Sequence, residues 1–352
     1  MTERASLASL SGTSLHDRSP GAHLEDPVTD LDLVFGGRVF CDLVMSGVQA
    51  PVPGAEVFAD GFALAAGGTA TRAVAGARLG FGTALVGAVG VDVFGTAVRA
   101  ELAGEPGLRL DWLAVLPDAH TAVTVALTSA AERSFITYEE RATWLGDRLP
   151  APLPAVAACH VGVAEGVPAW VDALRREGTF VVGGVGWDET GEWDTATLDR
   201  LAQVDAFVPN EDEARLYTRT DSADEAVQAL AARTGLVVVT RGERGALALD
   251  SASGDLCEVL APPVTAVDPT GAGDCFVAAL CGARTAGWDL RTCVGFAVLA
   301  ASLSVQRLGG ASSAPTAVEL ASLVRAGLDH DDLPAGDWGA VLEHLDAAAR
   351  RP

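Results

Sequence analysis

The chain has 352 residues and a formal net charge of −23, and 49% of its residues are hydrophobic while only 6% are aromatic. This length fits one large domain or two ordinary ones, and the negative charge argues against general binding to nucleic acid or to an anionic membrane surface. All 24 basic residues are arginine, which excludes a Schiff-base lysine, a P-loop lysine and the strand lysine of protein kinases.

Short apolar segments alternate with helical ones from residue 31 onward. Strands are predicted at residues 32–40, 83–90, 121–129, 133–138, 157–163, 179–184, 205–210, 235–240, 245–250 and 264–268. Helices are predicted at 68–79, 92–104, 167–176, 211–217, 223–233, 272–286, 291–305 and 316–326. In the second half, near-continuous apolar strands alternate with helices, which predicts an α/β fold whose mostly parallel sheet is covered on both faces. The alternating pattern of residues 121–138 is typical of a less buried hairpin.

The two ends of the chain read differently from the rest. Residues 1–30 lack the apolar region of a secretory signal and are expected to form a disordered polar extension. Residues 331–352 are expected to form an acidic turn and one appended amphipathic helix. The six cysteines form no C-x-x-C pair and the six histidines have no zinc-binding spacing. With no run of 18 apolar residues, we expect a cytoplasmic protein with free thiols and no membrane segment.

The stretch 267-VDPTGAGDCFVAAL-280 carries the clearest chemical signal. A predicted strand ends at Asp268 and a predicted helix contains Asp274, with a glycine-rich turn between them. Free main-chain N–H groups at a helix start form an anion site, and glycines let a ligand approach the backbone. A carboxylate beside such a site can accept a proton from a hydroxyl that attacks phosphorus. The alternative is that both aspartates only cap the helix.

This stretch resembles the hallmark of the ribokinase-like (PfkB) family of carbohydrate kinases, D-[TP]-T-G-A-G-D-x-F, at every defined position from Asp268 to Phe276. The resemblance implies a three-layer α/β/α fold with a mostly parallel sheet and a small β lid. It implies a kinase domain over residues 31–330, with the lid drawn from parts of about 43–62 and 119–140. It also implies the following roles: Asp274 as catalytic base, the amides of Gly271, Ala272 and Gly273 as an anion hole, and Asp268 and Thr270 as nucleotide-binding residues.

Two N-terminal segments resemble the same family. The segment 37-GRVFCD-42 matches its opening strand, which implies that Asp42 binds sugar hydroxyls, although a surface aspartate at a strand end would look the same. The segment 67-GGTATRAVAGARLG-80 matches its glycine-pair signature, so Gly67 and Gly68 are implied to bring the backbone against the sugar. Thr71 stands where the family usually has asparagine. The neighbouring Arg72 is interpreted either as a compensating donor or, in preference, as a solvated helix arginine.

Further segments resemble the nucleotide side of the family. In 209-PNEDEARLYT-218, Asn210 and Glu213 are implied to hold the hydrated Mg²⁺ and a phosphate, and the alternative is a plain helix cap. In 237-VVVTRGERGALAL-249, the implied nucleotide-binding residues are Thr240, Gly242 and Gly245. The segment 297–316 matches the closing helix and loop, expected near the adenine. The implied cofactors are ATP and Mg²⁺; the family also admits a monovalent cation, which no residue here decides.

The resulting functional hypothesis is ATP-dependent phosphorylation of a hydroxymethyl group on a sugar or sugar-like substrate. A nucleoside kinase of the same family stays open, because ribosyl groups present the same hydroxymethyl group and diol. A non-catalytic sugar-binding regulator with the same fold is the alternative from another class. The expected partners are a small-molecule sugar or nucleoside and ATP, with no nucleic acid and no membrane. A homodimer through the lid sheet is implied by the family and is not decided by any residue.

Overall fold

The computed structural model describes residues 31–49, 51, 53–128, 133–140, 155–330 and 332–351. The expected N-terminal extension, residues 1–30, lies outside these ranges. Within them, no helix is both long and apolar enough to cross a membrane. The six cysteines are all buried and free, as their spacing predicted.

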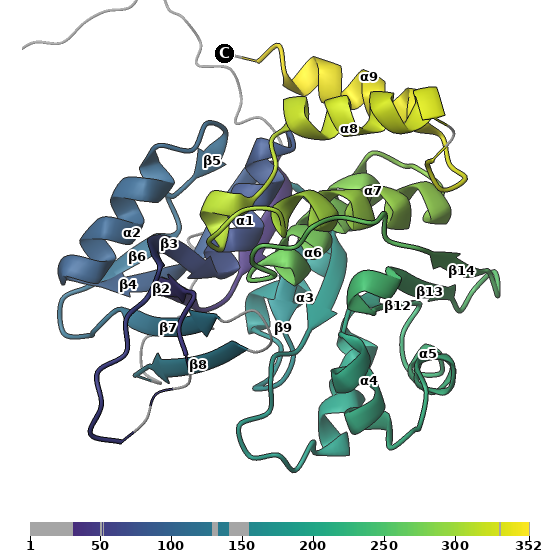
Figure 1. Ribbon diagram of the computed structural model, residues 1–352. Helices are drawn as coiled ribbons and strands as arrows, with labels where there is room; N and C mark the ends of the chain where they lie inside the picture. The colour runs from purple at the N-terminus through teal and green to yellow at the C-terminus, as the bar shows by residue number, and fades with distance from the viewer. Residues whose placement is uncertain are drawn as a thin grey trace, which may run out of the picture.

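A large, mostly parallel sheet forms the centre of the molecule (Figure 1). Its strands follow the order β14-β13-β12-β11-β10-β9-β1-β4-β5, with β6 beside β4, and only β13 and β14 run antiparallel to their neighbours. Every residue of β4 is buried, as expected for a strand covered on both faces. The bounds are β1 Leu31–Gly36, β4 Thr83–Gly90, β5 Leu108–Arg109, β6 Leu113–Leu116, β9 Val156–Gly162, β10 Phe180–Gly184, β11 Ala206–Phe207, β12 Leu236–Thr240, β13 Ala246–Asp250 and β14 Leu256–Val259.

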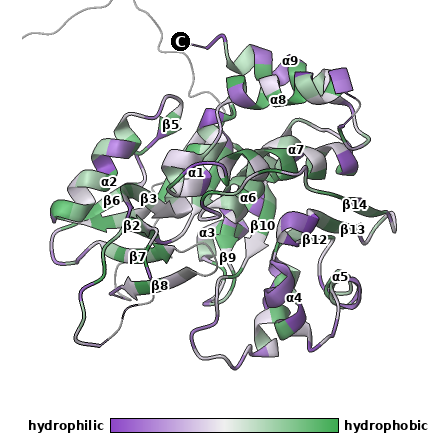
Figure 2. Ribbon diagram, in the orientation of Figure 1, coloured by the Kyte–Doolittle hydropathy of each residue, from purple (hydrophilic) through white to green (hydrophobic). Residues whose placement is uncertain are grey.

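Helices cover both faces of this sheet, which gives the three layers expected from the sequence. One face carries α1 (Thr69–Arg78), α6 (Ala272–Thr285) and α7 (Leu290–Ser304), and their apolar residues share one core cluster. The other face carries α3 (Ala169–Arg176), the 3-10 helix Thr195–Gln203, α4 (Glu211–Thr218) and α5 (Ala223–Ala231), which share a second cluster. Figure 2 shows α6 and α7 as largely hydrophobic, which fits their place inside the molecule.

Two helices extend the first layer outward. The helix α8 (Ala317–His330) packs against α7, and α9 (Trp338–Ala348), the appended helix expected from the sequence, packs against α8 (Figure 1). The imidazole of His344 in α9 stacks on the Phe81 ring with centroids 4.4 Å apart. This contact attaches the C-terminal helix to the end of α1 rather than leaving it as a separate unit.

A second, four-stranded sheet lies beside the large one, in the order β3-β2-β7-β8. Its strands are β2 (Val39–Ser46), β3 (Gly61–Gly68), β7 (Ala122–Thr128) and β8 (Arg133–Tyr138). Directly paired residues of neighbouring strands share one face of a sheet. Asp42 pairs with Thr124, and Thr124 pairs with Thr137, so these three polar residues lie on one face. The helix α2 (Val93–Ala103) packs against β2 and β3.

The expected strand 32–40 is in fact two strands in different sheets. The chain leaves the large sheet after β1 and enters the small one at β2, passing close to the start of α1. A Cβ at Gly37 would lie 2.1 Å from the Thr69 hydroxyl oxygen, so only glycine fits this passage. The expected strand 264–268 is wrong: residues 264–267 are exposed and belong to no strand, and Val267 and Asp268 donate hydrogen bonds to the Val305 carbonyl, not to a neighbouring strand.

Candidate active site

The Asp42 carboxylate lies in the middle of β2, with 8% of the residue exposed. The expectation of a surface aspartate at a strand end therefore does not describe it. On the adjacent strand, a Cβ at Gly67 would lie 2.1 Å from Asp42 Oδ2 and 2.4 Å from Oδ1. Glycine at position 67 thus leaves the space that the carboxylate occupies. Glu101 of α2 fixes this part of β3, because its carboxylate accepts a hydrogen bond of 2.7 Å from the Ala66 N–H.

Thr71 connects the Asp42 region with the glycine-rich turn before α6. Its side chain is buried, and its hydroxyl lies 3.4 Å from the Ala66 carbonyl. A Cβ at Gly310 would lie 3.3 Å from both Asp42 Oδ2 and Thr71 Oγ1, and one at Gly271 would lie 3.1 Å from Thr71 Cγ2. Residues from β2, α1, the turn before α6 and the loop after α7 therefore meet at one point.

Gly68 has a conformational role beside this point. It precedes α1 with a φ of 62°, in the region that favours glycine, and a Cβ there would lie 2.6 Å from the Arg38 carbonyl oxygen. Gly68 therefore permits the sharp passage from β3 into α1, whereas Gly67 is the glycine that contacts the carboxylate.

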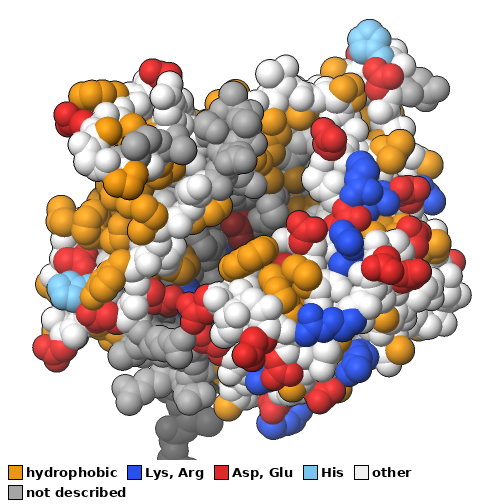
Figure 3. Space-filling view, turned by 60° about the horizontal axis from the view of Figure 1, so that its bottom comes forward, with side chains coloured by type: hydrophobic (Ala, Val, Ile, Leu, Met, Phe, Trp, Pro, Cys, Tyr) orange, Lys and Arg blue, Asp and Glu red, His pale blue; other side chains and the backbone are white. Residues whose placement is uncertain are grey.

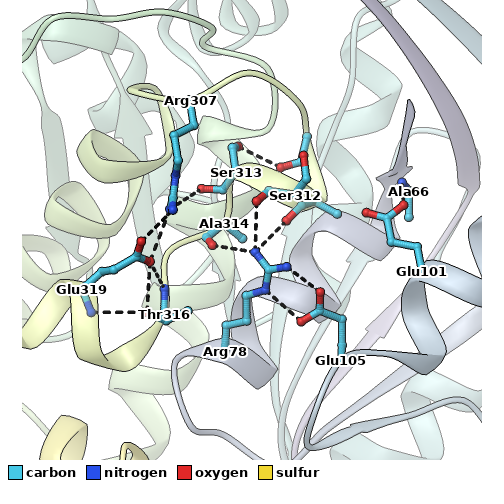
Figure 4. A network of polar contacts seen from close by, with 12 residues as sticks. Ala66, Arg78, Glu101, Glu105, Arg307, Ser312, Ser313, Ala314, Thr316 and Glu319 are labelled. Carbon is cyan, nitrogen blue, oxygen red and sulfur yellow. Dashed lines mark hydrogen bonds and ion pairs between the residues drawn. The ribbon is translucent and has the colours of Figure 1, made fainter. Parts of the chain in front are cut away.

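The loop that carries Gly310 is held by two arginines, as Figure 4 shows. The Arg78 guanidinium donates to three carbonyl groups of the loop and to both carboxylate oxygens of Glu105. Arg307 pairs with Glu319 and donates to the Ser313 carbonyl. The sequence suggested that segment 297–316 lies near the adenine. The structure places Gly310 of this segment against Asp42 and Thr71, and the position of the adenine stays a prediction.

The turn before α6 has the features of an anion site. Gly271 starts the helix with a φ of 81°, and the N–H groups of Gly271 and Gly273 find no acceptor among the described residues. The Thr270 hydroxyl is buried and has no partner in the same part of the chain, and a Cβ at Gly273 would meet nothing within 4 Å. The Ala272 N–H differs, because it donates to the Pro269 carbonyl at 3.2 Å. Two of the three amides expected to form the anion hole therefore have an N–H group that is free to bind an anion.

Asp268 is fully buried, and both of its carboxylate oxygens have partners. Oδ1 accepts from the Thr270 N–H at 2.9 Å and Oδ2 accepts from the Gly309 N–H at 3.0 Å. Asp268 therefore joins the turn before α6 to the loop that carries Gly310. Its contacts hold the anion site in shape and leave no carboxylate oxygen facing a ligand.

Asp274 lies in the first turn of α6 and forms an ion pair with Arg72 of α1, with 2.8 Å between Oδ1 and Nη2. The side chains of Arg72 and Asp274 are 22% and 21% exposed. The preferred interpretation of Arg72 as a solvated helix arginine is therefore wrong, because its side of α1 faces α6. Burial raises the pKa of the Asp274 carboxyl, and the Arg72 charge opposes this rise.

The pKa of Asp42 is raised to about 7, first by burial and then by the negative charges of Asp274, Glu101 and Asp268. A buried carboxylate that repels other carboxylates is stabilised by donors or by a cation. No described residue donates a hydrogen bond to Asp42. Figure 3 shows a hollow in this face of the molecule with acidic side chains inside it, which fits such a site.

On the opposite side of the site, Asn210 and Glu213 form a capping box at the start of α4. Asn210 Oδ1 accepts from the Glu213 N–H at 2.9 Å, and Glu213 Oε2 accepts from the Asn210 N–H at 2.8 Å. The helix-cap alternative therefore describes their hydrogen bonds. Burial raises the pKa of Glu213 to about 7, and the bond from Asn210 and the charge of Arg72 oppose that rise. A bound cation would relieve this cost, so the pair fits a hydrated Mg²⁺ held through waters.

The turn after β12 lies beside the start of α4. Thr240 donates from its N–H to the Pro209 carbonyl and forms a parallel bridge with Asn210. Gly242 and Gly245 both have positive φ, 57° and 79°, and a Cβ at Gly242 would meet nothing within 4 Å. Arg244 of this turn pairs with Glu211 of α4. The motif residues on the nucleotide side are thus contiguous, at the carboxyl ends of β11 and β12, where open α/β sheets bind ligands.

Comparison with known proteins decides the family. The model of the pfkB family carbohydrate kinases matches residues 54–317. The chain belongs to this family. Over 314 residues it is 28% identical to a ribokinase of Schizosaccharomyces pombe, covering 82% of the chain and 96% of the relative. Over 294 residues it is 28% identical to a nucleoside kinase of Methanothermobacter thermautotrophicus, covering 81% of the chain and 93% of the relative.

A solved structure shows the same fold. The structure of Arabidopsis thaliana ribokinase complexed with ribose and ATP superposes with a TM-score of 0.68 at 25% identity, covering 84% of this chain and 99% of that one. The PfkB kinase described here is therefore a ribokinase-like phosphotransferase with an alcohol group as acceptor, acting on carbohydrates or nucleosides. The expected family, fold and enzyme class are confirmed.

Proposed function

We propose that this PfkB kinase transfers the terminal phosphoryl group of ATP to a hydroxymethyl group of a sugar or sugar-like substrate, with Asp274 as the catalytic base. The observation that carries this proposal is the contact between Gly271 and the Thr71–Gly310 pair. This contact supports an acceptor pocket around Asp42 that adjoins an anion site at the start of the helix of Asp274. An acceptor bound at the first place has its reactive hydroxyl next to a phosphoryl group at the second.

Each side of the site supplies a separate chemical requirement. Asp42 accepts hydrogen bonds from two hydroxyl groups of the substrate, because its two oxygens accept none from the described residues. The N–H groups of Gly271 and Gly273 and the Thr270 hydroxyl donate to the phosphoryl oxygens. Asp274 takes the proton from the attacking hydroxyl, and its position at a helix start beside the anion site suits that role.

Asn210 and Glu213 would hold Mg²⁺ through its water shell, and Thr240, Gly242 and Gly245 would line the nucleotide. When bound, the ion neutralises charge on the triphosphate. The described residues contain no group of three or more His, Cys, Asp or Glu that could enclose a metal ion, which agrees with an ion held mainly by waters and phosphates. Measuring ADP release with and without potassium chloride tests whether the enzyme depends on a monovalent cation.

The test is ADP release over a panel of sugars and nucleosides, with two matched variants. Asp274→Asn removes the proposed base, and Asp289→Asn changes an acid that caps the start of α7 away from the site. We expect Asp274→Asn to lower kcat by more than a hundredfold at nearly unchanged KM, and Asp289→Asn to retain activity, since Asn also caps helices well. Equal activity of the two variants would reduce Asp274 to a helix cap.

A nucleoside acceptor is the second candidate, favoured by the place of Phe135. Phe135 pairs with Ala126, and the alternation along β7 puts it on the same face of the small sheet as Asp42. An exposed aromatic ring on that face suits stacking on a base. If nucleosides are the substrates, Phe135→Leu should raise KM for the nucleoside several-fold and leave KM for ribose unchanged.

The opposite face of the small sheet favours the homodimer. Phe62, Leu64, Ile136 and Tyr138 lie on that face and are exposed, and apolar surface of this kind is typical of a protein interface. We expect a dimer in sedimentation velocity and a monomer after Phe62→Ser together with Ile136→Ser. A monomeric wild-type protein at micromolar concentration would contradict this.

A further inference from the structure

Arg72 occupies a central position that the motifs do not assign. It is the one charged residue in the first nine residues of α1, and its guanidinium reaches across to the start of α6. Besides the 2.8 Å contact with Asp274, its positive charge acts on Glu213 of α4 and on His160 of β9. Arg72 thus contacts the proposed base, and its charge also acts on the proposed magnesium residue.

The surroundings of Arg72 do not resemble those of a merely structural ion pair. Its Nε is buried and has no hydrogen-bond partner in the described part of the chain, so the guanidinium is not fully paired. The imidazole of His160, on which the charge of Arg72 acts, is buried, and its Nδ1 has no hydrogen-bond partner in the described part of the chain. Burial and Arg72 keep the pKa of His160 well below its ordinary value, so His160 adds no second positive charge. Because the chain contains no lysine, only an arginine or a protonated histidine can supply a positive side-chain charge beside Asp274.

We propose that Arg72 is a positioning residue for phosphoryl transfer, which keeps the Asp274 carboxylate ionised and oriented toward the acceptor pocket. The inference rests on the proposed role of Asp274 as base. A general base acts only when it is deprotonated, and burial raises the pKa of this carboxyl and so favours its protonated form. The ion pair with Arg72 counters that effect at the oxygen it contacts. The unpaired Nε leaves the same guanidinium able to donate further.

The other charged groups around Asp274 are negative, so their effect on its pKa is opposite to that of Arg72. Asp42 of β2 interacts with it across the acceptor pocket, and the Cys275 thiol, the next residue along α6, has a pKa raised to about 12 by burial and by Asp274. Asp268 adds negative charge on the side of Asp42. Arg72 is therefore the group that holds the pKa of Asp274 down. Removing its charge must move the titration of Asp274 to higher pH.

The experiment is a titration of the carboxyl groups of the full-length protein labelled with ¹³C at the aspartate side chains, with Asp274→Asn assigning the signal. We expect the Asp274 midpoint in Arg72→Met to lie about one to two pH units above wild type, since a contacting arginine has an effect of that size. Arg72→Lys should stay closer to wild type. The control is Arg99→Met, which removes the charge of an exposed arginine of α2 and so changes the net charge by the same amount.

Activity provides the second readout. In Arg72→Met, the acid limb of kcat/KM should move to higher pH with the midpoint, so that the variant loses about ten- to a hundredfold at pH values below both midpoints and recovers most of its activity above them. An unchanged Asp274 midpoint, or a loss equal at every pH, would overturn the proposal. If Arg72→Met does not fold, the ¹⁵N guanidinium signals of wild-type Arg72 decide: they must titrate together with Asp274. A wild type without phosphotransfer would instead count against the proposed function.

Discussion

Replacing Gly67 by alanine tests the acceptor pocket at its narrowest point. The added Cβ would lie between 2.1 and 2.4 Å from three atoms of the Asp42 carboxylate, which is far inside van der Waals contact. The carboxylate must therefore turn away or β3 must shift. Overpacking of this kind costs about 1–3 kcal/mol of folding free energy, and since the obstructing group is the end of a side chain we expect the lower part of that range.

The effect on the acceptor should be larger than the effect on stability. A hydrogen bond to a charged group contributes about 1.5–3 kcal/mol, so losing two bonds at Asp42 corresponds to roughly a hundredfold or greater fall in kcat/KM. KM for ATP should hardly change, because the turn before α6 does not contact Gly67. The assay is ADP release with the acceptor and ATP varied in turn, together with a thermal melt of each variant.

The matched control is Gly186→Ala, where a Cβ would meet nothing within 4 Å and the backbone has no positive φ. This substitution should leave both activity and stability close to wild type or slightly improved. If Gly67→Ala keeps the KM and kcat of wild type for its acceptor, Asp42 does not bind that acceptor and the pocket is misassigned.

Two further perturbations test the electrostatics and the loop of the site. The pKa of Asp42 in the folded protein is raised to about 7 from 3.8, its ordinary value in an unfolded chain, so ionising it costs stability in full above pH 7, and this cost disappears as the pH falls toward 4. At pH 8, Asp42→Asn should therefore be more stable than wild type by about 2–4 kcal/mol and melt several degrees higher, and near pH 4 the two proteins should not differ. The variant should also lose acceptor binding. A melting temperature below that of wild type at pH 8 would contradict the assignment. Arg78→Ala removes donors to the loop of Gly310 and should cost about 2–3 kcal/mol and raise KM for the acceptor, with Glu105→Gln intermediate; an unchanged KM would show that the loop does not shape the pocket.

The sequence predicted the helices and most strands of the large sheet because apolar periodicity reports burial directly, but it missed β3 of the small sheet and the strands β5, β6 and β14. It also failed where one local pattern covers two strands: residues 32–40 read as one strand, and the pairings of β1 and β2 show that the chain changes sheets there. Residues 264–268 look like a strand by composition, yet they follow the last strand of the chain and pair with no strand, and residues 264–267 are exposed. β-structure depends on such a neighbour, which a local window does not contain.

The motifs identified residues that the fold brings together, including Asp42, Gly67, Thr71 and Gly271. Their partners were harder to foresee. Gly310 meets Asp42 across more than 260 residues of sequence, and the Arg72–Asp274 pair joins two helices about 200 residues apart. An arginine near the start of an alanine-rich helix, next to a motif threonine, was the available signal for Arg72. Asp268 shows the reverse: its motif position suggested a ligand contact, but its oxygens hold the loop instead.

The central claim is that one continuous site binds the acceptor at Asp42 and the transferred phosphoryl group at the start of α6. A crystal structure with the preferred acceptor and a non-hydrolysable ATP analogue measures this directly. It should show acceptor hydroxyls on the Asp42 oxygens, and the terminal phosphate on the N–H groups of Gly271 and Gly273, within reach of the Asp274 carboxylate. A terminal phosphate bound elsewhere, or an acceptor out of contact with Asp42, would contradict the account.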